Sequence, residues 1–415
     1  MILRVTEEGA YSNIALQAAL DRSGLGRRDR ALAAELAYGT IRRLLALDWT
    51  LARHSSRPVD CMTREVRGLL RLGAYQLFFT RIPDHAAVSE TVGLAGSAER
   101  GFVNAVLRSL AARGPEWPQG DDDEAVSIRT GLAAWAVREL RRLLGDEAEE
   151  CAAALGEQAP LTIRANTCRV GVDELEGALR SSGSRPGRGT IHPEALVVEG
   201  ADPRLLPGFD EGWFVVQDQA SSFVVDALDP APGERILDAC AGPGGKAGHI
   251  ACLVGASGMV VGADVSPPRT GLVATQARRL GVRVHVVVQD ARAPALHGPF
   301  DRVLVDAPCS GLGAARRRPE LLWRVRRDDL SRLARLQVAI ALACAGLLRP
   351  GGRLVYSVCT FPRAETDAAC DAILRHRSDL RPIPVPGPEG DAERVRLWPH
   401  RHGTDAMFVA GFERA

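Results

Sequence analysis

Residues 235–246 read R-I-L-D-A-C-A-G-P-G-G-K, and the interpretation of the whole chain depends on this stretch. A short apolar run ends at Asp238 and is followed by glycines at positions 242, 244 and 245. Glycines in such a turn let a strand pass tightly into a helix, whose first backbone N–H groups are free to face a ligand. Lys246 closes the turn and is the only lysine in the chain, which otherwise uses arginine. Because lysine is a compact donor with a tunable pKa, we expect Lys246 to have a functional role.

From residue 212 onward the chain alternates between predicted strands and helices. The predicted strands cover residues 235–237, 259–263, 282–288, 302–305 and 353–357, and the predicted helices include 269–280 and 330–347. This alternation is typical of an α/β, Rossmann-like fold with a doubly wound parallel sheet, which binds ligands beyond the carboxyl ends of its strands. The strands lead to Asp238, Asp264, Asp290, Asp306 and Cys359. We therefore expect these five side chains to converge on one edge of the sheet.

The composition and the cysteine pattern limit which class of protein this is and where it is located. The chain is 46% apolar and 25% charged with a formal net charge of +1, and its N-terminus lacks the layout of a secretion signal. Its apolar runs fall far short of the roughly 20 residues that a membrane span needs. The nine cysteines include no Cys-x-x-Cys pair. This pattern predicts reduced thiols, a cytoplasmic location and no metal site.

The sequence divides into three predicted domains. Residues 1–118 form a predicted all-α domain, with helical periodicity from residue 11 to about residue 113 and many arginines, for which a solvated face is the ordinary explanation. Residues 114–124 are rich in proline, glycine and acidic residues and indicate a linker. A small α/β domain is predicted over residues 125–207, with strands at 161–166 and 195–199 and a helix at 172–180. The doubly wound domain is predicted over residues 208–415.

The glycine turn also carries a nucleotide-binding pattern. Residues 242–247 fit G-x-G-x-x-[GA], and Asp264 lies about 20 residues further on, where a ribose-binding carboxylate belongs. A phosphate-binding P-loop is excluded, because Cys240 stands where its first glycine would be and Ala247 replaces its Ser or Thr. The pattern fits a dinucleotide and an S-adenosyl ligand equally well. Asp264 and Asp290 suit the ribose hydroxyls and the adenine, unless they only cap helices.

Two cysteine motifs follow neighbouring strands. Asp306, Pro308 and Cys309 occur in D-A-P-C-S-G, and Cys359 occurs in Y-S-V-C-T. A single cysteine at such a place is more often buried packing than a nucleophile. Two thiols on adjacent strand tips, beside a carboxylate and a lone lysine, instead favour catalysis.

An arginine cluster follows the first cysteine motif. Its arginines are at positions 316, 317, 318, 324, 326 and 327, with Trp323 among them. Arginines beside an aromatic ring suit a phosphate backbone and an unstacked base. A solvated face is the alternative, and the position of the cluster beside the predicted pocket slightly favours nucleic acid.

The motifs LDACAGPGGK, DAPCSG and YSVCT, in this order and spacing, resemble the S-adenosylmethionine-dependent RNA cytosine-5 methyltransferases. DHAAVSETVGLAG followed by FVNAVLR is similar to the NusB-like RNA-binding domain at the N-terminus of the bacterial RsmB branch. GWFVVQDQASS and LWPHRHGTDAMFVAGF are similar to the same branch. There are two departures from the family pattern: Gly242 stands where the family usually has alanine, and Glu365-Thr366 stands where Glu-Asn is common.

The resemblance implies a cofactor, a substrate and a set of site residues. The S-adenosylmethionine site would consist of Cys240, Ala241, Gly242, Pro243, Gly244, Gly245, Lys246, Asp264, Asp290 and Asp306. Cys359 would be the nucleophile and Cys309 the second cysteine. The substrate would be RNA, with 16S ribosomal RNA favoured over transfer RNA. We expect a monomer without a membrane partner.

The chemistry of cytosine explains why these groups are needed. Carbon 5 is too weak a nucleophile to accept a methyl group until a thiolate adds to carbon 6. Cys359 would supply the thiolate, and Lys246 or the cofactor's positive charge would help it to ionise. Asp306, protonated or sharing a proton, would hydrogen-bond ring nitrogen 3, and Cys309 would promote the final elimination. The base must first be flipped or presented from a single-stranded loop.

Two other classes of protein remain as alternatives. A nicotinamide-dependent oxidoreductase would use the same glycine turn but leaves both cysteine motifs unexplained. A non-catalytic RNA-binding or antitermination protein would account for the N-terminal domain but has no use for Cys309 and Cys359.

Overall fold

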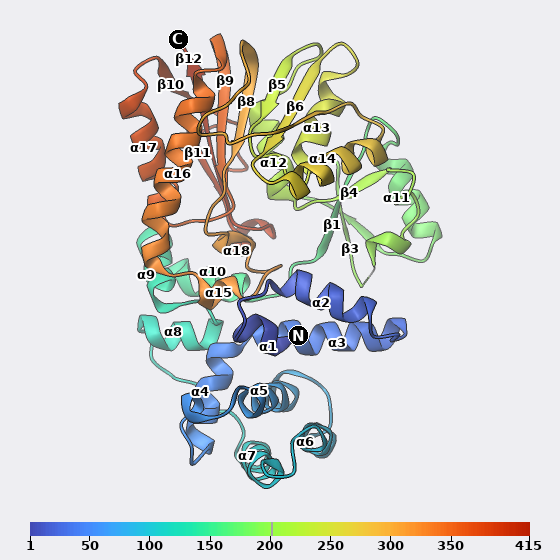
Figure 1. Cartoon of the computed structure of the whole chain (residues 1–415), viewed down its shortest axis with the longest axis vertical. Coiled ribbons are helices and arrows are strands. Elements are labelled where there is room, and N and C mark those ends of the chain that lie inside the picture. Colours follow the sequence, from blue (N-terminus) through green and yellow to red (C-terminus); the bar gives the residue numbers. More distant parts are fainter. Residues whose placement is uncertain (201) are drawn as a thin grey trace. The chain divides into compact units, whose positions relative to one another are not determined.

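The computed structural model describes residues 1–200 and 202–415, which form two compact units (Figure 1). The first unit consists of Met1–Gln158 and Ala315–Arg326, and the second of Ala159–Ala314 and Arg327–Ala415. Residues 125–158 therefore group with the N-terminal helices, whereas the sequence-based division begins the small α/β domain at residue 125. Within the described residues, no helix is long and apolar enough to cross a membrane.

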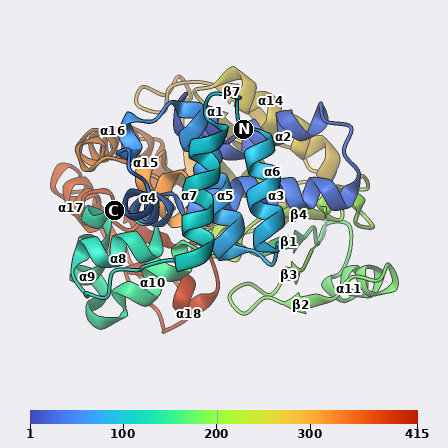
Figure 2. The same cartoon turned by 90° about the horizontal axis from the view of Figure 1, so that it is seen from below.

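The first unit is entirely helical, as predicted for residues 11–113. Its α-helices are α1 (Ile2–Thr6), α2 (Ser12–Asp21), α3 (Arg27–Arg42), α4 (Leu44–His54), α5 (Arg64–Phe79), α6 (Asp84–Gly93), α7 (Arg100–Arg113), α8 (Asp123–Thr130), α9 (Ala134–Leu144), α10 (Ala148–Leu155) and α15 (Leu321–Arg324). Figure 2 shows α5, α6 and α7 side by side. Leu51, Leu70 and Leu107 are fully buried where α4, α5 and α7 meet. Apolar residues spaced three or four apart on each helix account for this core.

The second unit is built on an eight-stranded sheet. Its strands are β5 (Arg235–Asp238), β6 (Met259–Asp264), β7 (His285–Val288), β8 (Phe300–Asp306), β9 (Leu348–Val358), β10 (Leu380–Ile383), β11 (Arg394–Leu397) and β12 (Met407–Arg414). Their order is β10-β12-β9-β8-β5-β6-β7, and β11 pairs with β12. Strands β5 to β9 are parallel, which confirms the five predicted strands, whereas β12 runs antiparallel to β9 and to β10 and β11. This antiparallel part was not predicted.

Helices cover both faces of this sheet. The helices α12 (Gln219–Leu228) and α13 (Gly245–Val254) lie on one face, and α16 (Arg327–Ala345) and α17 (Asp367–His376) lie on the other, while α14 (Pro267–Leu280) packs beside α13, β6 and β7 (Figure 1). Successive residues of β8 alternate between the two cores, as the period of two requires: Leu304 packs with Ile250 of α13, and Val305 packs with Ile340 of α16. Burying such a side chain contributes roughly 1.5–3 kcal/mol. The strands are thus fixed in register from both sides.

A smaller antiparallel sheet precedes the main one. It contains β1 (Leu161–Ala165), β2 (Pro186–Arg188), β3 (Ala195–Val198) and β4 (Phe214–Val216) in the order β2-β3-β1-β4, with α11 (Val172–Ser181) nearby in sequence. Leu175 and Leu179 of α11 are buried against Ile163 and Leu196 of the sheet. These elements confirm the strands predicted at 161–166 and 195–199 and the helix predicted at 172–180.

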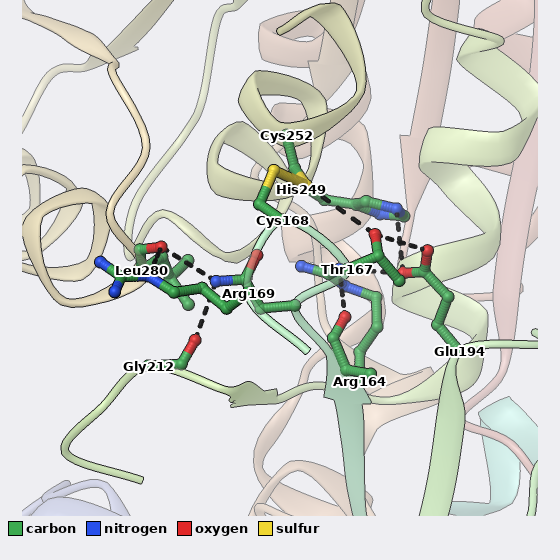
Figure 3. Close-up of a disulfide and its surroundings, with 11 residues drawn as sticks. Arg164, Thr167, Cys168, Arg169, Glu194, Gly212, His249, Cys252 and Leu280 are labelled. Atoms are coloured by element: carbon green, nitrogen blue, oxygen red, sulfur yellow. Dashed lines mark hydrogen bonds and ion pairs between the residues drawn. A yellow bond between two sulfur atoms is a disulfide. The ribbon is translucent and has the colours of Figure 1, made fainter. Parts of the chain in front are cut away.

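A disulfide joins the small sheet to the main one. Cys168, in the loop after β1, is bonded to Cys252 of α13, with a Cα–Cα distance of 5.8 Å (Figure 3). The expectation of reduced thiols is wrong for this pair. The two residues are 84 positions apart in sequence, so no spacing pattern could reveal that the packing of α13 beside the loop brings them together.

We predict that the disulfide stabilises the second unit under non-reducing conditions. Cross-linking residues 84 positions apart restricts the unfolded chain and typically contributes about 2–4 kcal/mol. Cys168→Ser should therefore lower the unfolding temperature when no reductant is present, and a thiol reductant should abolish the difference between the two proteins. Cys61→Ser, which changes an exposed free cysteine, serves as the control. An equal loss with and without reductant would contradict a role for the bond.

Candidate active site

The predicted site residues lie along one edge of the main sheet. Asp264 and Asp306 are the last residues of β6 and β8, Asp290 follows β7, and Cys359 follows β9. The glycine turn connects β5 to α13. Because β7, β6, β5, β8 and β9 are neighbours in this order and are parallel, their carboxyl ends form a continuous edge. The predicted convergence is confirmed.

The backbone of the turn explains its glycines. Gly244 has φ +109°, and a Cβ at this position would lie 3.0 Å from the Cα of Val273. Its amide donates to the carbonyl of Ala241 at 2.7 Å, and the amide of Ala241 donates to the carbonyl of Ala263 at 2.7 Å. Helix α13 begins immediately afterwards, and the first N–H groups of a helix form a favourable site for a negatively charged group.

Asp264 is part of this turn. Its carboxylate is almost fully buried and accepts from the amide of Gly242 at 3.2 Å and from the amide of Ser266 at 3.0 Å. A Cβ on Gly242 would lie 2.7 Å from Asp264 Oδ2 and 2.7 Å from Arg269 Nε, so this chain has a tight fit where the family usually has alanine. Ser266 is the N-cap residue of α14, so Asp264 does not have the capping role considered above.

Asp290 is less closely connected to the turn. Its carboxylate pairs with Arg292 two residues further on, at 2.5 Å. The hydrogen bond from Arg292 lowers the pKa of Asp290 to about 2, so Asp290 is ionised at neutral pH. Asp290 lies at the predicted strand end, but among the described residues its carboxylate contacts Arg292 and not the glycine turn.

Lys246 and Asp306 form a partly buried ion pair between the turn and β8. Lys246 Nζ lies 2.6 Å from Asp306 Oδ2, and the Ser357 hydroxyl donates to Asp306 Oδ1 at 2.9 Å. Burial acts to lower the pKa of Lys246, but the charge and hydrogen bond of Asp306 outweigh it, and the pKa is raised. The lysine is therefore an ammonium at neutral pH. Ser357, which the sequence analysis did not select, fixes the second oxygen of Asp306.

The two cysteine motifs bring their thiols into contact. Cys309 Sγ and Cys359 Sγ are 3.5 Å apart, although the residues are 50 positions apart in sequence. The hydrogen bond to Cys359 and burial raise the pKa of Cys309 well above its usual value. Cys309 is therefore a protonated thiol that can donate to the sulfur of Cys359. A negative charge on Cys359 would act in turn to raise the pKa of Lys246, so the ammonium lies within electrostatic reach of this sulfur.

Asp238 is a further acidic group at the site. It is 1% exposed, and neither carboxyl oxygen receives a well-formed hydrogen bond from the described residues. Burial and the neighbouring charge of Asp306 raise the pKa of Asp238 to about 7. The sequence placed Asp238 at a strand end but gave no sign that it would be uncharged over much of the acidic range.

A separate group of titratable side chains joins the small sheet to α13. His192, Glu194 and His249 have potential metal-binding atoms within 4.8 Å of one another. However, Glu194 accepts hydrogen bonds from Arg164 at 3.1 Å and from Thr167 at 3.1 Å (Figure 3). A cation would have to displace the buried Arg164 guanidinium, so we interpret the group as an ion-pair network.

The structure gives part of the arginine cluster after Cys309 a role different from the predicted one. Arg324 donates to the backbone carbonyl of Val5 at 2.6 Å and to that of Ala10 at 3.0 Å. Trp323 Nε1 donates to the carbonyl of Ile41 at 3.0 Å, and Arg316 is buried. The expectation that the cluster faces nucleic acid is therefore wrong for Trp323, Arg324 and the buried Arg316, which are used within their own unit. For the other arginines of the cluster it stays a prediction.

Three parts of the chain match known families. Residues 225–413 match the family described as 16S rRNA methyltransferase RsmB/F. Residues 1–112 match the NusB family, and residues 132–203 match the ferredoxin-like domain of RsmF/B-like methyltransferases.

Similar proteins cover almost the whole chain. A putative methyltransferase of Mycobacterium tuberculosis is 41% identical, with 99% of this chain and 94% of that protein aligned. The probable ribosomal RNA small subunit methyltransferase B of Bacillus subtilis is 33% identical, with 100% and 97% aligned. The crystal structure of a methyltransferase homolog from Pyrococcus horikoshii is 26% identical with a TM-score of 0.63, covering 71% of this chain and 100% of its own. NSun6 from Pyrococcus horikoshii, solved with the S-adenosylmethionine analogue SFG, is 25% identical with a TM-score of 0.59, covering 67% and 97%.

We predict that Asp238 makes the stability of the second unit depend on pH. Its folded-state pKa of about 7 exceeds the ordinary value of 3.8, so the folded state binds more protons and loses stability as the pH rises between these values. The loss approaches roughly 4 kcal/mol, from about 1.4 kcal/mol per pKa unit. Asp238→Asn removes the titration, so its stability relative to the unmodified protein should grow from pH 4 to pH 7 and then level off. Denaturant unfolding across this range measures the difference, and a difference independent of pH would contradict the assignment.

Proposed function

Because the chain belongs to the 16S rRNA methyltransferase RsmB/F family, we propose that it methylates carbon 5 of a cytosine in small-subunit ribosomal RNA. As a member of this family it is an S-adenosylmethionine-dependent RNA methyltransferase. The observation that carries the cytosine-5 chemistry is the 3.5 Å contact between the sulfurs of Cys309 and Cys359, with the Lys246–Asp306 pair beside it. For residues 1–118 we propose a role in holding RNA. A cytoplasmic location and a monomeric state stay predictions.

The residues at the sheet edge fit S-adenosylmethionine, which supplies the methyl group when bound. We assign Asp264, at the carboxyl end of β6, to the ribose of this ligand, and the N-terminus of α13 can hold an anionic group. The buried oxygens of Asp238 lack well-formed partners and can accept from a donor on the ligand. We propose that the whole turn from Cys240 to Lys246 surrounds this ligand, with Asp290 and Asp306 completing the site.

Cys359 is the proposed nucleophile. Its sulfur adds to carbon 6 of the cytosine, and the displaced electron pair makes carbon 5 reactive enough to take the methyl group. The ammonium of Lys246 and the thiol of Cys309 both stabilise a thiolate at Cys359, the first by charge and the second by a hydrogen bond.

The Lys246–Asp306 pair supplies the proton that the ring needs. Negative charge builds up toward ring nitrogen 3 when the thiolate adds, and a hydrogen-bond donor there lowers the barrier. At a distance of 2.6 Å, Lys246 and Asp306 can share one proton, and Ser357 holds the other oxygen of Asp306 in place. Asp306 can then donate to ring nitrogen 3 with the proton that Lys246 supplies.

Cys309 acts in the release step. The hydrogen bond to Cys359 is the largest cause of its raised pKa, and that bond is lost once the sulfur of Cys359 is attached to carbon 6. The pKa of Cys309 then falls, so that its proton can pass to water and the resulting thiolate can take the proton from carbon 5. Loss of this proton returns the electron pair to the ring, and the Cys359 thiolate leaves.

Substitution of each cysteine should separate the two steps. Cys359→Ala should abolish methylation, because it removes the sulfur proposed to attack carbon 6. Cys309→Ala should still attack but release slowly, leaving a protein–RNA adduct that survives denaturing electrophoresis. Both are measured with tritiated S-adenosylmethionine and ribosomal RNA, and Cys344→Ala, which changes a buried cysteine in α16, is the control. Appreciable turnover by Cys359→Ala would disprove its role, and absence of an adduct with Cys309→Ala would disprove the other.

The substrate is tested by bisulfite sequencing of total RNA from cells with and without the gene. We expect one cytosine of small-subunit ribosomal RNA to lose its protection when the gene is deleted. Loss of protection in a transfer RNA would keep the mechanism and change the substrate. No difference at any cytosine would contradict the proposed activity and favour the non-catalytic RNA-binding alternative.

A further inference from the structure

A buried carboxylate lies behind the two thiols. Glu365, in the short helix Arg363–Glu365, is 0% exposed. Its Oε1 accepts from the amide of Ser310 at 2.9 Å and from Gln337 Nε2 at 2.9 Å, and its Oε2 accepts from the Ser310 hydroxyl at 2.5 Å. All three donors are uncharged. The carboxylate is thus held by hydrogen bonds from one residue next to Cys309 and from one residue of α16.

Gln337 also holds the residue on the other side of Cys309. The side-chain amide of Gln337 also donates to the backbone carbonyl of Pro308 at 3.0 Å. Glu365 and Gln337 together therefore hold the residues immediately before and after Cys309. The backbone of this cysteine is fixed from both directions.

The same network reaches the strand that carries Cys359. The Tyr356 hydroxyl donates to the backbone carbonyl of Glu365 at 2.6 Å and lies 3.0 Å from Gln337 Oε1. On the far side of Cys359, the Thr360 hydroxyl is 2.7 Å from the hydroxyl of Ser310. Residues on both sides of each thiol therefore belong to one buried hydrogen-bond network.

Such a network is costly unless every group is satisfied. Burial raises the pKa of Glu365, because removing a carboxylate from water disfavours its charge. A buried polar network of this kind makes the arrangement of the groups unique when it is complete. Its members flank the reactive sulfurs without touching them, which suits a role in placing the thiols.

We propose that Glu365 is a positioning residue that fixes Cys309 against Cys359 and is required for release of the methylated RNA more than for covalent attachment. The inference rests on the proposed function. Cys359 directly follows β9, whose pairing with β8 and β12 continues through Ser357 and Val358, so the sheet itself holds this sulfur. Cys309 lies in a loop, and its flanking residues depend directly on Glu365 and Gln337. Loss of the carboxylate should therefore displace the releasing thiol first.

The test compares Glu365→Ala, Glu365→Gln and Cys309→Ala in one assay of adduct formation and turnover. Glu365→Ala should lower kcat by about 100-fold, the cost of a displacement of about 1 Å, while the adduct accumulates and KM for S-adenosylmethionine changes little. Glu365→Gln should restore most of the release rate. The amide oxygen of this variant can accept from the backbone amide of Ser310 and from Gln337 Nε2. Its NH₂ group can donate to the Ser310 hydroxyl, which can rotate toward Thr360.

A matched control separates positioning from general loss of stability. Arg302 lies near the opposite end of β8, where it donates to Glu234 at 2.6 Å and to the carbonyl of Leu228 at 2.7 Å. Arg302→Met should destabilise the same unit without causing the adduct to accumulate.

The possible results distinguish the two proposals. If Cys309→Ala accumulates the adduct and Glu365→Ala does not, the inference about Glu365 is overturned and the proposed function stands. The same holds if Glu365→Ala and Arg302→Met lose adduct formation and turnover to the same extent. Unchanged turnover of Glu365→Ala would overturn it as well. Absence of an adduct with Cys309→Ala would overturn the proposed function, and the inference with it.

Discussion

The partly buried ion pair between Lys246 and Asp306 joins the glycine turn to the strand that leads to the first cysteine. Ion pairs that are removed from water seldom add much net stability, because the loss of hydration offsets their attraction. The place of this pair fits the proposed chemistry, in which it supplies an ammonium near Cys359 and a proton near the base. The charge of Asp306 also acts on Asp238. A second ionised carboxylate next to Asp306 would be repelled by it, and Asp238, with a pKa raised to about 7, avoids part of that repulsion by taking up a proton.

The two thiols show how one contact can give identical groups different roles. At 3.5 Å they share a hydrogen bond, so the proton that Cys309 retains stabilises the charge on Cys359. When Cys359 becomes bonded to carbon, that stabilisation has no further use and Cys309 is free to lose its proton. In the proposed mechanism, the contact between the two sulfurs therefore determines the order of the chemical steps, provided that both loops are held rigidly.

Much of the site could be predicted because it depends on the sheet alone. Parallel strands must end at a common edge, so locating the strands was sufficient to bring Asp264, Asp306 and Cys359 together. The Cys168–Cys252 disulfide could not be predicted, because it depends on how α13 packs beside the small sheet. The antiparallel strands β10 to β12 were missed because they lack the regular alternation with helices. Part of the arginine cluster was misinterpreted because the sequence does not show that Arg324 donates to backbone carbonyls.

The first unit is not built from one continuous segment of the chain. Beyond Cys309, the amide of Gly313 donates to the backbone carbonyl of Cys359 at 3.0 Å, so the chain still contacts the backbone of the second cysteine at this point. Two residues later it enters the segment Ala315–Arg326, which folds as part of the helical unit. Trp323 donates to α3, and Arg324 donates to Val5 of α1 and to Ala10 beyond it, so that both side chains hold this segment in its unit. The chain therefore passes between the units after residues 158, 314 and 326, and the second of these crossings comes five residues after Cys309. A truncation at residue 158 would separate the segment Ala315–Arg326 from the helices with which it folds.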